Sequence, residues 1–169
     1  MMGDASECTS RMTLHFAYGS NMSRALMSPR CPHAAEIGPA VLRGHRFVIT
    51  ADGYASIMPC PGAAVHGLVW RLTARDLAAL NAYERIDAGL YQARIMPVRC
   101  GARRRHALVY IGRSRTLGRP KPGYLDLVLA AARELALPAD YVRALARWAP
   151  SRWSAARAPE MGELAGEPL

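Results

Sequence analysis

The sequence has no apolar run that approaches the roughly 18 residues a membrane-spanning helix requires. Its first residues lack the hydrophobic segment of a secretory signal, and the acids Asp4 and Glu7 are untypical of a transit peptide. From these absences we expect a cytoplasmic protein without a membrane partner.

Cysteine is scarce and scattered. The four cysteines, Cys8, Cys31, Cys60 and Cys100, include no C-x-x-C pair, so neither a disulfide framework nor a zinc site is expected. Cys31 and His33 lie close together, but no second pair of ligands accompanies them. We therefore predict no bound metal.

Motifs for nucleotide cofactors and for common nucleophiles are also missing. The chain contains neither a G-x-G-x-x-G loop nor a Walker loop, which argues against a nucleotide cofactor. Ser20 lies in a predicted sharp turn, yet the G-x-S-x-G elbow of serine hydrolases is absent and no histidine stands out as its partner. Glu84 and Asp87 could form the carboxylate pair of a glycosidase, although this spacing is common at helix ends.

Lysine is nearly absent, and the net charge of +9 comes almost entirely from arginine. Lys121 is the single lysine, and the arginines are spread along the chain with one cluster at residues 103–105. This cluster is predicted to lie in a turn between two strands. No RNA-recognition motif accompanies it, so we interpret it as a solvated basic surface without a specific nucleic-acid partner.

A chain of 169 residues with 51% hydrophobic and 21% charged residues is typical of one globular domain. The hydrophobic periodicity typical of helices and strands is absent from both ends of the sequence. This pattern predicts a loose leader (1–12), a single domain (13–148) and a flexible tail (149–169). The sequence does not distinguish a monomer from a homodimer.

The hydrophobic patterns predict an α+β domain with a mainly antiparallel, curled sheet rather than a regular βαβ alternation. Strands are expected at residues 13–18, 41–50 with an interruption at Gly44, 55–58 with a stop at Pro59–Gly62, 65–70, 90–100 and 106–112. Helices are expected at residues 23–27, ending near Pro29, from Thr73 to either Tyr83 or Glu84, and at 122–136 and 138–148.

The helix predicted after Thr73 places a carboxyl group on an apolar stripe. Thr73 and Asp76 form a capping-box pattern. Leu77 and Leu80 then form the stripe, with Glu84 at position i+7. If the helix continues to Glu84, poor hydration and the helix C-terminus should both raise the pKa of this carboxyl. The alternative is that the helix ends one residue earlier and Glu84 lies in a solvated turn.

Near the N-terminus, an apolar strand pattern leads into a Gly-Ser-Asn turn. Gly19 permits a sharp backbone turn, and Ser20 and Asn21 favour local hydrogen bonds to the main chain. A helical pattern follows from Ser23. Such a loop can direct several backbone N–H groups at a carboxylate or phosphate, although an ordinary strand-to-helix turn has the same pattern.

Two segments of the chain form a combination that is more specific than either alone. They are Tyr18-Gly19-Ser20-Asn21-Met22 after the first strand, and Glu84 ahead of Gly89-Leu90-Tyr91. Tyr110 in a late strand and Pro122-Gly123-Tyr124 at a helix start support them. With these residues, positions 14–148 resemble the γ-glutamylcyclotransferase-like family. The resemblance implies a small mixed, mainly antiparallel β-barrel flanked by helices, which agrees with the α+β class.

Members of this family cyclise a γ-glutamyl group: its α-amine attacks its own γ-carbonyl and releases 5-oxoproline and an amine, without a cofactor. By resemblance, the main-chain amides of Tyr18–Met22 would hold the glutamyl group and Glu84 would be the general acid/base. Arg85 could pair with Glu84, but one helical step of about 100° should turn it toward solvent. Tyr91, Tyr110 and Tyr124 match positions that line the pocket in relatives.

The resemblance also indicates a substrate class. The glutathione-specific branch has a residue other than Asn at the position of Asn21. The γ-glutamylamine branch has Thr at the position of Ser20. The resemblance thus favours γ-glutamyl amino acids as the small-molecule substrates, and removal of a γ-glutamyl protecting group from a biosynthetic intermediate, as in some relatives, stays an alternative. The alternative function is a non-catalytic module of the same fold that binds γ-glutamyl groups or small anions, with a basic RNA-associated protein as a more distant alternative.

Overall fold

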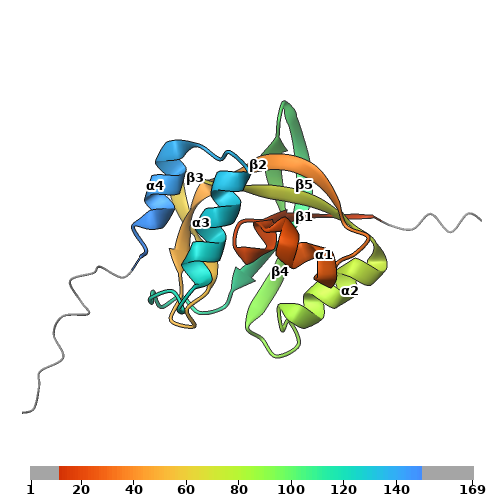
Figure 1. The fold of residues 1–169 in the computed structure, drawn as a ribbon, viewed down its shortest axis with the longest axis horizontal. Helices are drawn as coiled ribbons and strands as arrows, with labels where there is room; N and C mark the ends of the chain where they lie inside the picture. The colour runs from red at the N-terminus through yellow and green to blue at the C-terminus, as the bar shows by residue number, and fades with distance from the viewer. Residues whose placement is uncertain (1–11, 150–169) are drawn as a thin grey trace, which may run out of the picture.

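The computed structural model describes residues 12–149, and its centre is a closed barrel of five strands in the order β1-β3-β2-β4-β5 (Figure 1). The elements are β1 (Thr13–Ala17), the 3-10 turn η1 (Ser20–Met22), α1 (Arg24–Arg30), β2 (Ala35–Ile49), β3 (Ala55–Leu72), α2 (Ala74–Tyr83), β4 (Tyr91–Cys100), β5 (Arg103–Gly112), α3 (Tyr124–Glu134) and α4 (Ala139–Ala146). Within this part of the chain, every neighbouring strand pair is antiparallel except β1 with β5. The expected α+β class and mainly antiparallel barrel are confirmed.

The predicted leader at 1–12 and tail at 149–169 lie, apart from residues 12 and 149, outside the described residues. Their boundaries stay predictions, as does the limit of 13–148 for a single domain. Among the described residues, no helix has both the length and the apolar character needed to cross a bilayer.

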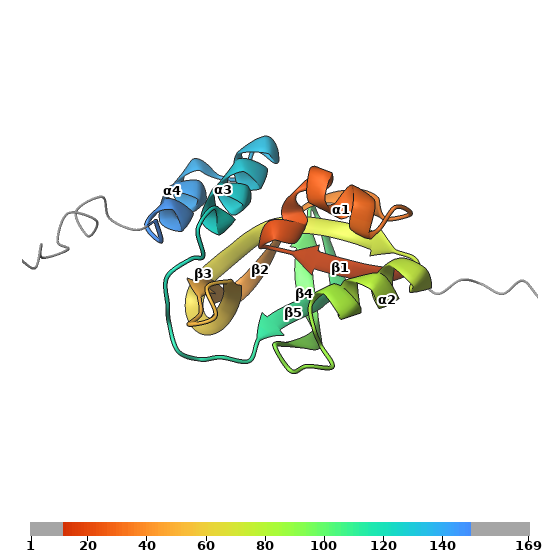
Figure 2. The same ribbon diagram turned by 60° about the horizontal axis from the view of Figure 1, so that its bottom comes forward.

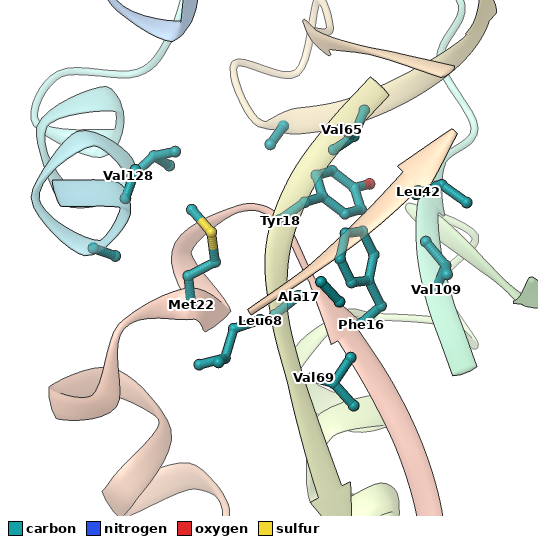
Figure 3. Close-up of a cluster of buried hydrophobic side chains, with 14 of the residues drawn as sticks. Phe16, Ala17, Tyr18, Met22, Leu42, Val65, Leu68, Val69, Val109 and Val128 are labelled. Carbon is teal, nitrogen blue, oxygen red and sulfur yellow. The ribbon is translucent and has the colours of Figure 1, made fainter. Parts of the chain in front are cut away.

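One apolar core fills the barrel and continues beneath the covering helices. Phe16 of β1 and Tyr18, which directly follows β1, lie among Leu42, Val65 and Val109, which come from β2, β3 and β5 (Figure 3). Phe16 is completely buried, and Tyr18 is 5% exposed. Because side chains alternate between the two faces of a strand, this packing fixes both the register of β1 and the starting point of the loop that follows it.

The longest strand pair, β2–β3, shows that two predicted strand boundaries are wrong. β2 continues through Gly44, and β3 continues through Pro59–Gly62. Gly44 has a φ of 74°, and the register between the two strands shifts at this point. A β-bulge accommodates the glycine and bends the ribbon, and strands tolerate proline beside such irregularities. The predicted short strands are therefore parts of one long curled ribbon.

Helices cover the barrel on two sides: α1 and α2 contact one another, and α3 contacts both η1 and α4 (Figure 2). The predicted end of α1 near Pro29 is confirmed, because the helix ends at Arg30 and this proline lies in its last turn. Its missing N–H removes one intrahelical hydrogen bond, the one that the Ala25 carbonyl would accept. The Cys31 N–H still donates to the Met27 carbonyl (2.8 Å) and completes the turn.

The first turn of α2 is fixed by the predicted capping box. Asp76 N–H donates to Thr73 Oγ1, and Thr73 N–H donates to the Asp76 carboxylate. Asp76 also accepts a hydrogen bond from the His33 N–H (3.3 Å) and so ties the helix to the chain segment after α1. The start of α2 is therefore held from outside the helix as well as from within.

The β4–β5 hairpin and the connection to α3 carry the entire excess of positive charge. Residues 88–125 contain nine of the 22 Lys and Arg residues and none of the 13 Asp and Glu residues. Residues 103–105 were expected in a turn but belong to β5, because Gly101 and Ala102 suffice for the turn. Arg104 lies directly opposite Arg99, a like-charge pair that is tolerable because both side chains are exposed to water.

Candidate active site

A cavity of about 1000 Å³ lies beside the C-terminal end of β1. Its wall combines η1, the ends of α1 and α2, part of β5, and the loops that precede β3 and α3. The structure brings together all but one of the residues predicted for the site, namely Tyr18, Gly19, Ser20, Asn21, Glu84, Tyr91, Tyr110 and Tyr124. The exception is Met22, whose side chain lies in the core toward Val128 (Figure 3) and does not line the cavity.

Glu84 combines the two alternatives that the sequence leaves open. The helix α2 ends at Tyr83, and Glu84 is its C-cap residue. Glu84 is nevertheless only 8% exposed, because its side chain turns into the cavity wall rather than into solvent. Burial raises the pKa of this carboxyl from about 4.5 to about 6, and the nearby Asn21 and Arg30 side chains limit the rise.

This burial predicts a pH-dependent loss of stability. The folded-state pKa of Glu84 lies above its unfolded-state value, so the folded chain binds more protons between pH 4.5 and 6, and the fold weakens as the pH rises through this window. Above it, the penalty is on the order of 2 kcal/mol. The stability of Glu84→Gln relative to wild type should therefore grow by about 2 kcal/mol between pH 4 and pH 7.5, as measured by urea unfolding.

Glu134→Gln is the matched control, because Glu134 is an exposed carboxyl on α3. Its stability relative to wild type should change little over the same pH range. If the Glu84 and Glu134 variants behaved alike, the Glu84 carboxyl would be hydrated in the folded protein.

Asn21 connects Glu84 to a cation that the sequence analysis misses. Asn21 Nδ2 donates to Glu84 Oε1 (2.6 Å), and Arg30 Nη1 donates to Asn21 Oδ1 (2.8 Å). Arg85 is exposed, as expected, and within residues 12–149 it forms no ion pair with Glu84. Nothing in the sequence distinguishes Arg30 from the other arginines, because Tyr83 and Glu84, near which the fold places it, are far away along the chain.

The loop after β1 needs glycine for space rather than for an unusual φ. Gly19 has a φ of −112°, but a Cβ atom there would lie 2.8 Å from Tyr124 Oη and 3.2 Å from Ala55 Cβ. Met22 N–H donates to the Gly19 carbonyl (3.0 Å) and closes the turn. Among the described residues, the N–H groups of Ser20 and Asn21 donate to no backbone carbonyl, and the Ser20 N–H faces the Tyr124 hydroxyl at the cavity.

Tyr91 and Tyr124 are held at the same backbone position across the cavity. Tyr91 Oη donates to the Ala55 carbonyl (2.8 Å), and the Ala55 N–H donates to Tyr124 Oη (3.2 Å). Burial raises the pKa of Tyr124 to about 12 and raises that of Tyr91 as well. Both phenols therefore remain neutral at physiological pH and add no charge beside Glu84.

Tyr110 joins the sheet to the last turns of α2. Its hydroxyl donates to Asn81 Oδ1 (2.6 Å), and its carbonyl accepts a hydrogen bond from the Tyr18 hydroxyl. His15 packs beside the Tyr110 ring with a centroid distance of 5.1 Å. Burial lowers the pKa of His15 to about 4, so this imidazole is neutral and a weaker base than Glu84.

The residues considered for a metal site have other surroundings. Cys31 Sγ lies 3.5 Å from the Asp76 carbonyl, and His33 contacts the Asp76 carboxylate. Residues 12–149 contain no cluster of three or more His, Cys, Asp or Glu side chains that could hold a metal ion. The cysteines of this region, Cys31, Cys60 and Cys100, are free, and Cys8 lies outside it.

Comparison with known proteins places this chain in one family. The family model described as gamma-glutamyl cyclotransferase, AIG2-like, matches residues 15–126. Mouse and human γ-glutamylcyclotransferase are 24% and 25% identical over 164 residues, which is 89% of this chain and 86% of each relative. The chain therefore belongs to the γ-glutamyl cyclotransferase family, as the sequence resemblance predicted.

Solved structures agree with this assignment. A γ-glutamyl cyclotransferase structure aligns with a TM-score of 0.75 and 25% identity over 80% of this chain and 86% of that chain. YkqA from Bacillus subtilis shares the fold, with a TM-score of 0.72 and 22% identity over 82% of this chain and 54% of that protein.

Proposed function

We propose that this protein cyclises γ-glutamyl compounds with Glu84 as the general acid/base. The α-amine nitrogen attacks the γ-carbonyl carbon, a new C–N bond closes a five-membered ring, and the γ-amide C–N bond breaks. The products are 5-oxoproline and the free amine of the leaving group, so the atoms balance without a cofactor. The observation that carries the proposal is the buried Glu84 carboxyl in the cavity of a chain that belongs to this enzyme family.

Glu84 has the acidity that this reaction requires. The α-ammonium group of the substrate must lose a proton before it can attack, and the leaving amine must gain one. A carboxyl with a pKa of about 6 is largely ionised at pH 7, yet it binds a proton readily enough to return it to the leaving group. One residue can therefore serve as base and then as acid.

The loop amides supply fixed donors for the negatively charged parts of the substrate. The N–H groups of Ser20 and Asn21 adjoin the same cavity as Glu84. In the proposed reaction they bind the glutamyl α-carboxylate or the developing γ-oxyanion and hold the substrate in the curled geometry that ring closure requires. The phenols of Tyr91 and Tyr124 form the neighbouring wall.

The charges around the cavity favour a leaving group with its own carboxylate. Arg30, Arg85 and Lys121 line it, whereas Asp52 and Glu84 are its acidic residues. We therefore propose γ-glutamyl amino acids as the substrate class. The proposed reaction needs no other binding partner. A cytoplasmic location and a monomeric or homodimeric state stay predictions.

The test is the release of 5-oxoproline from γ-glutamyl-L-alanine, γ-glutamyl-L-glutamine, glutathione and γ-glutamylethylamine. Turnover of the first two substrates above the others is the expected result. Calorimetric binding of these compounds without turnover of any of them would instead support the non-catalytic binding module. If the protein bound none of these compounds and turned none of them over, both functions would be contradicted.

A further inference from the structure

The Asn21 side chain is bonded on both sides, and the two bonds together determine its orientation. Its amide nitrogen donates to Glu84 Oε1 and its amide oxygen accepts from Arg30 Nη1. Asn21 is only 7% exposed, so water cannot readily replace either partner. An asparagine amide has two orientations related by a 180° flip, and the groups at its ends select one of them.

Arg30 is the partner that makes this selection unambiguous. A guanidinium has five N–H donors and no acceptor, so it can only face the amide oxygen. A carboxylate has acceptors only, and a flipped Asn21 would place its oxygen against Glu84 and its nitrogen against Arg30. With Arg30 in place, Asn21 must present its N–H₂ group to the carboxylate. Without Arg30, a neutral Glu84 could equally donate its own proton to a flipped Asn21.

Arg30 is itself held in place by the residue next to Glu84. Its guanidinium carbon lies 3.6 Å from the centroid of the Tyr83 ring, and Nη2 donates to the Tyr83 hydroxyl (2.7 Å). Stacking on an aromatic face and hydrogen bonding suit the planar guanidinium better than an ammonium group. The contacts therefore run from Tyr83 through Arg30 and Asn21 back to Glu84, and connect the end of α1, η1 and the end of α2.

The other titratable groups that face Glu84 are uncharged, so Arg30 is the cation that affects the pKa of Glu84. They are the phenols of Tyr18 directly after β1, Tyr91 on β4, Tyr110 on β5 and Tyr124 on α3. Burial raises the pKa of each phenol, so all are neutral when Glu84 titrates. The proton affinity of Glu84 thus reflects burial on one side and the Asn21–Arg30 arrangement on the other.

We infer that Arg30 is a positioning residue, which fixes the amide of Asn21 as a donor to Glu84 and thereby sets the orientation and proton affinity of the carboxyl. This inference rests on the proposed function for its catalytic consequence. The arrangement itself can be measured without turnover. In this role Arg30 contributes to catalysis through Asn21 and Glu84 and does not contact the reacting atoms.

The experiment measures the titration of Glu84 by ¹³C NMR of the side-chain carboxyl carbon in the substrate-free full-length protein, with the signal assigned by its absence in Glu84→Gln. Arg30→Met should raise the titration midpoint by about one pH unit. Arg30→Lys restores a donor and a charge without the stacked geometry and should give an intermediate midpoint. In turnover assays, the acidic limb of the kcat profile should move by the same amount, and kcat should largely recover above pH 8.

Arg24→Met is the matched control. Arg24 lies on the same helix, but its guanidinium binds the surface carboxylates Glu36 and Glu134. Its loss should leave the Glu84 midpoint unchanged. An unchanged midpoint in both Arg30 variants would overturn the inference, and so would a higher KM with an unmoved kcat profile, which would identify Arg30 as a substrate contact. If the wild type released no 5-oxoproline while Arg30→Met still raised the midpoint, the proposed function would fail and the positioning role would stand.

Discussion

Glu84→Gln is expected to lower kcat for 5-oxoproline release by about 1000-fold, a typical contribution of general acid/base catalysis. Glutamine is nearly isosteric with glutamate, and its side-chain oxygen can still accept the hydrogen bond from Asn21 Nδ2. The variant therefore keeps the shape of the cavity and loses only the group that can accept a proton from the α-ammonium. Steady-state assays with the best dipeptide of the panel would measure the loss.

Asp87→Asn provides the matched control, because Asp87 is an exposed carboxyl in the turn after α2. It should retain kcat within about twofold, as expected for an exposed residue outside the cavity lining. Turnover by Glu84→Gln within tenfold of the wild type would place the base at another residue. Dipeptide binding by the variant would show that lost turnover does not reflect a collapsed cavity.

Gly67→Ala is expected to destabilise the fold by about 3 kcal/mol and to displace the loop that leads into the site. A Cβ atom at Gly67 would lie 2.1 Å from the Ala17 carbonyl oxygen and 3.0 Å from Phe16 Cε2. The backbone of β1 passes β3 at this point, just before the chain enters Tyr18–Met22. Relief of the clash must move either the strand or the loop, so stability and turnover should fall together. Urea unfolding and the 5-oxoproline assay measure the two effects.

Gly101→Asn is a suitable control for a change of glycine. Gly101 has a φ of 58° at the β4–β5 turn, and nothing lies within 4 Å of a Cβ built there. Asparagine adopts this left-handed conformation more readily than most residues, so stability and activity should change little. If Gly67→Ala were as well tolerated as Gly101→Asn, the close approach of β1 to β3 would not be a requirement of the fold.

Local patterns were enough to predict the elements that contain the site. The capping box at Thr73 and the leucine stripe predicted α2, because these features depend on neighbours within a few residues, but they left the position of Glu84 open. The exact end of the helix was open, since a C-cap residue can be buried or solvated. Its burial depends on the strands and loops packed against it.

Other features depended on residues far apart in the sequence. Gly44 can break a strand or form a bulge, and the pairing with β3 decided between these outcomes. Arg30 became part of the site only because the fold brings α1 next to η1 and the end of α2. The closeness of Gly67 to Ala17 likewise exists only in the closed barrel. No spacing rule within one segment contains this information.

The attachment of α2 at both ends has a mechanical consequence. Its first turn is tied through Asp76 to the segment after α1, and its last turn is tied through Tyr83 and Glu84 to Arg30 and Asn21. The loop that carries Asn21 and the helix end that carries Glu84 therefore cannot separate without breaking the buried Asn21–Glu84 hydrogen bond together with the part-buried contact of Arg30. If the cavity widens to admit a substrate or release a product, we expect the movement in the opposite wall, in the surface loops that precede β3 and α3.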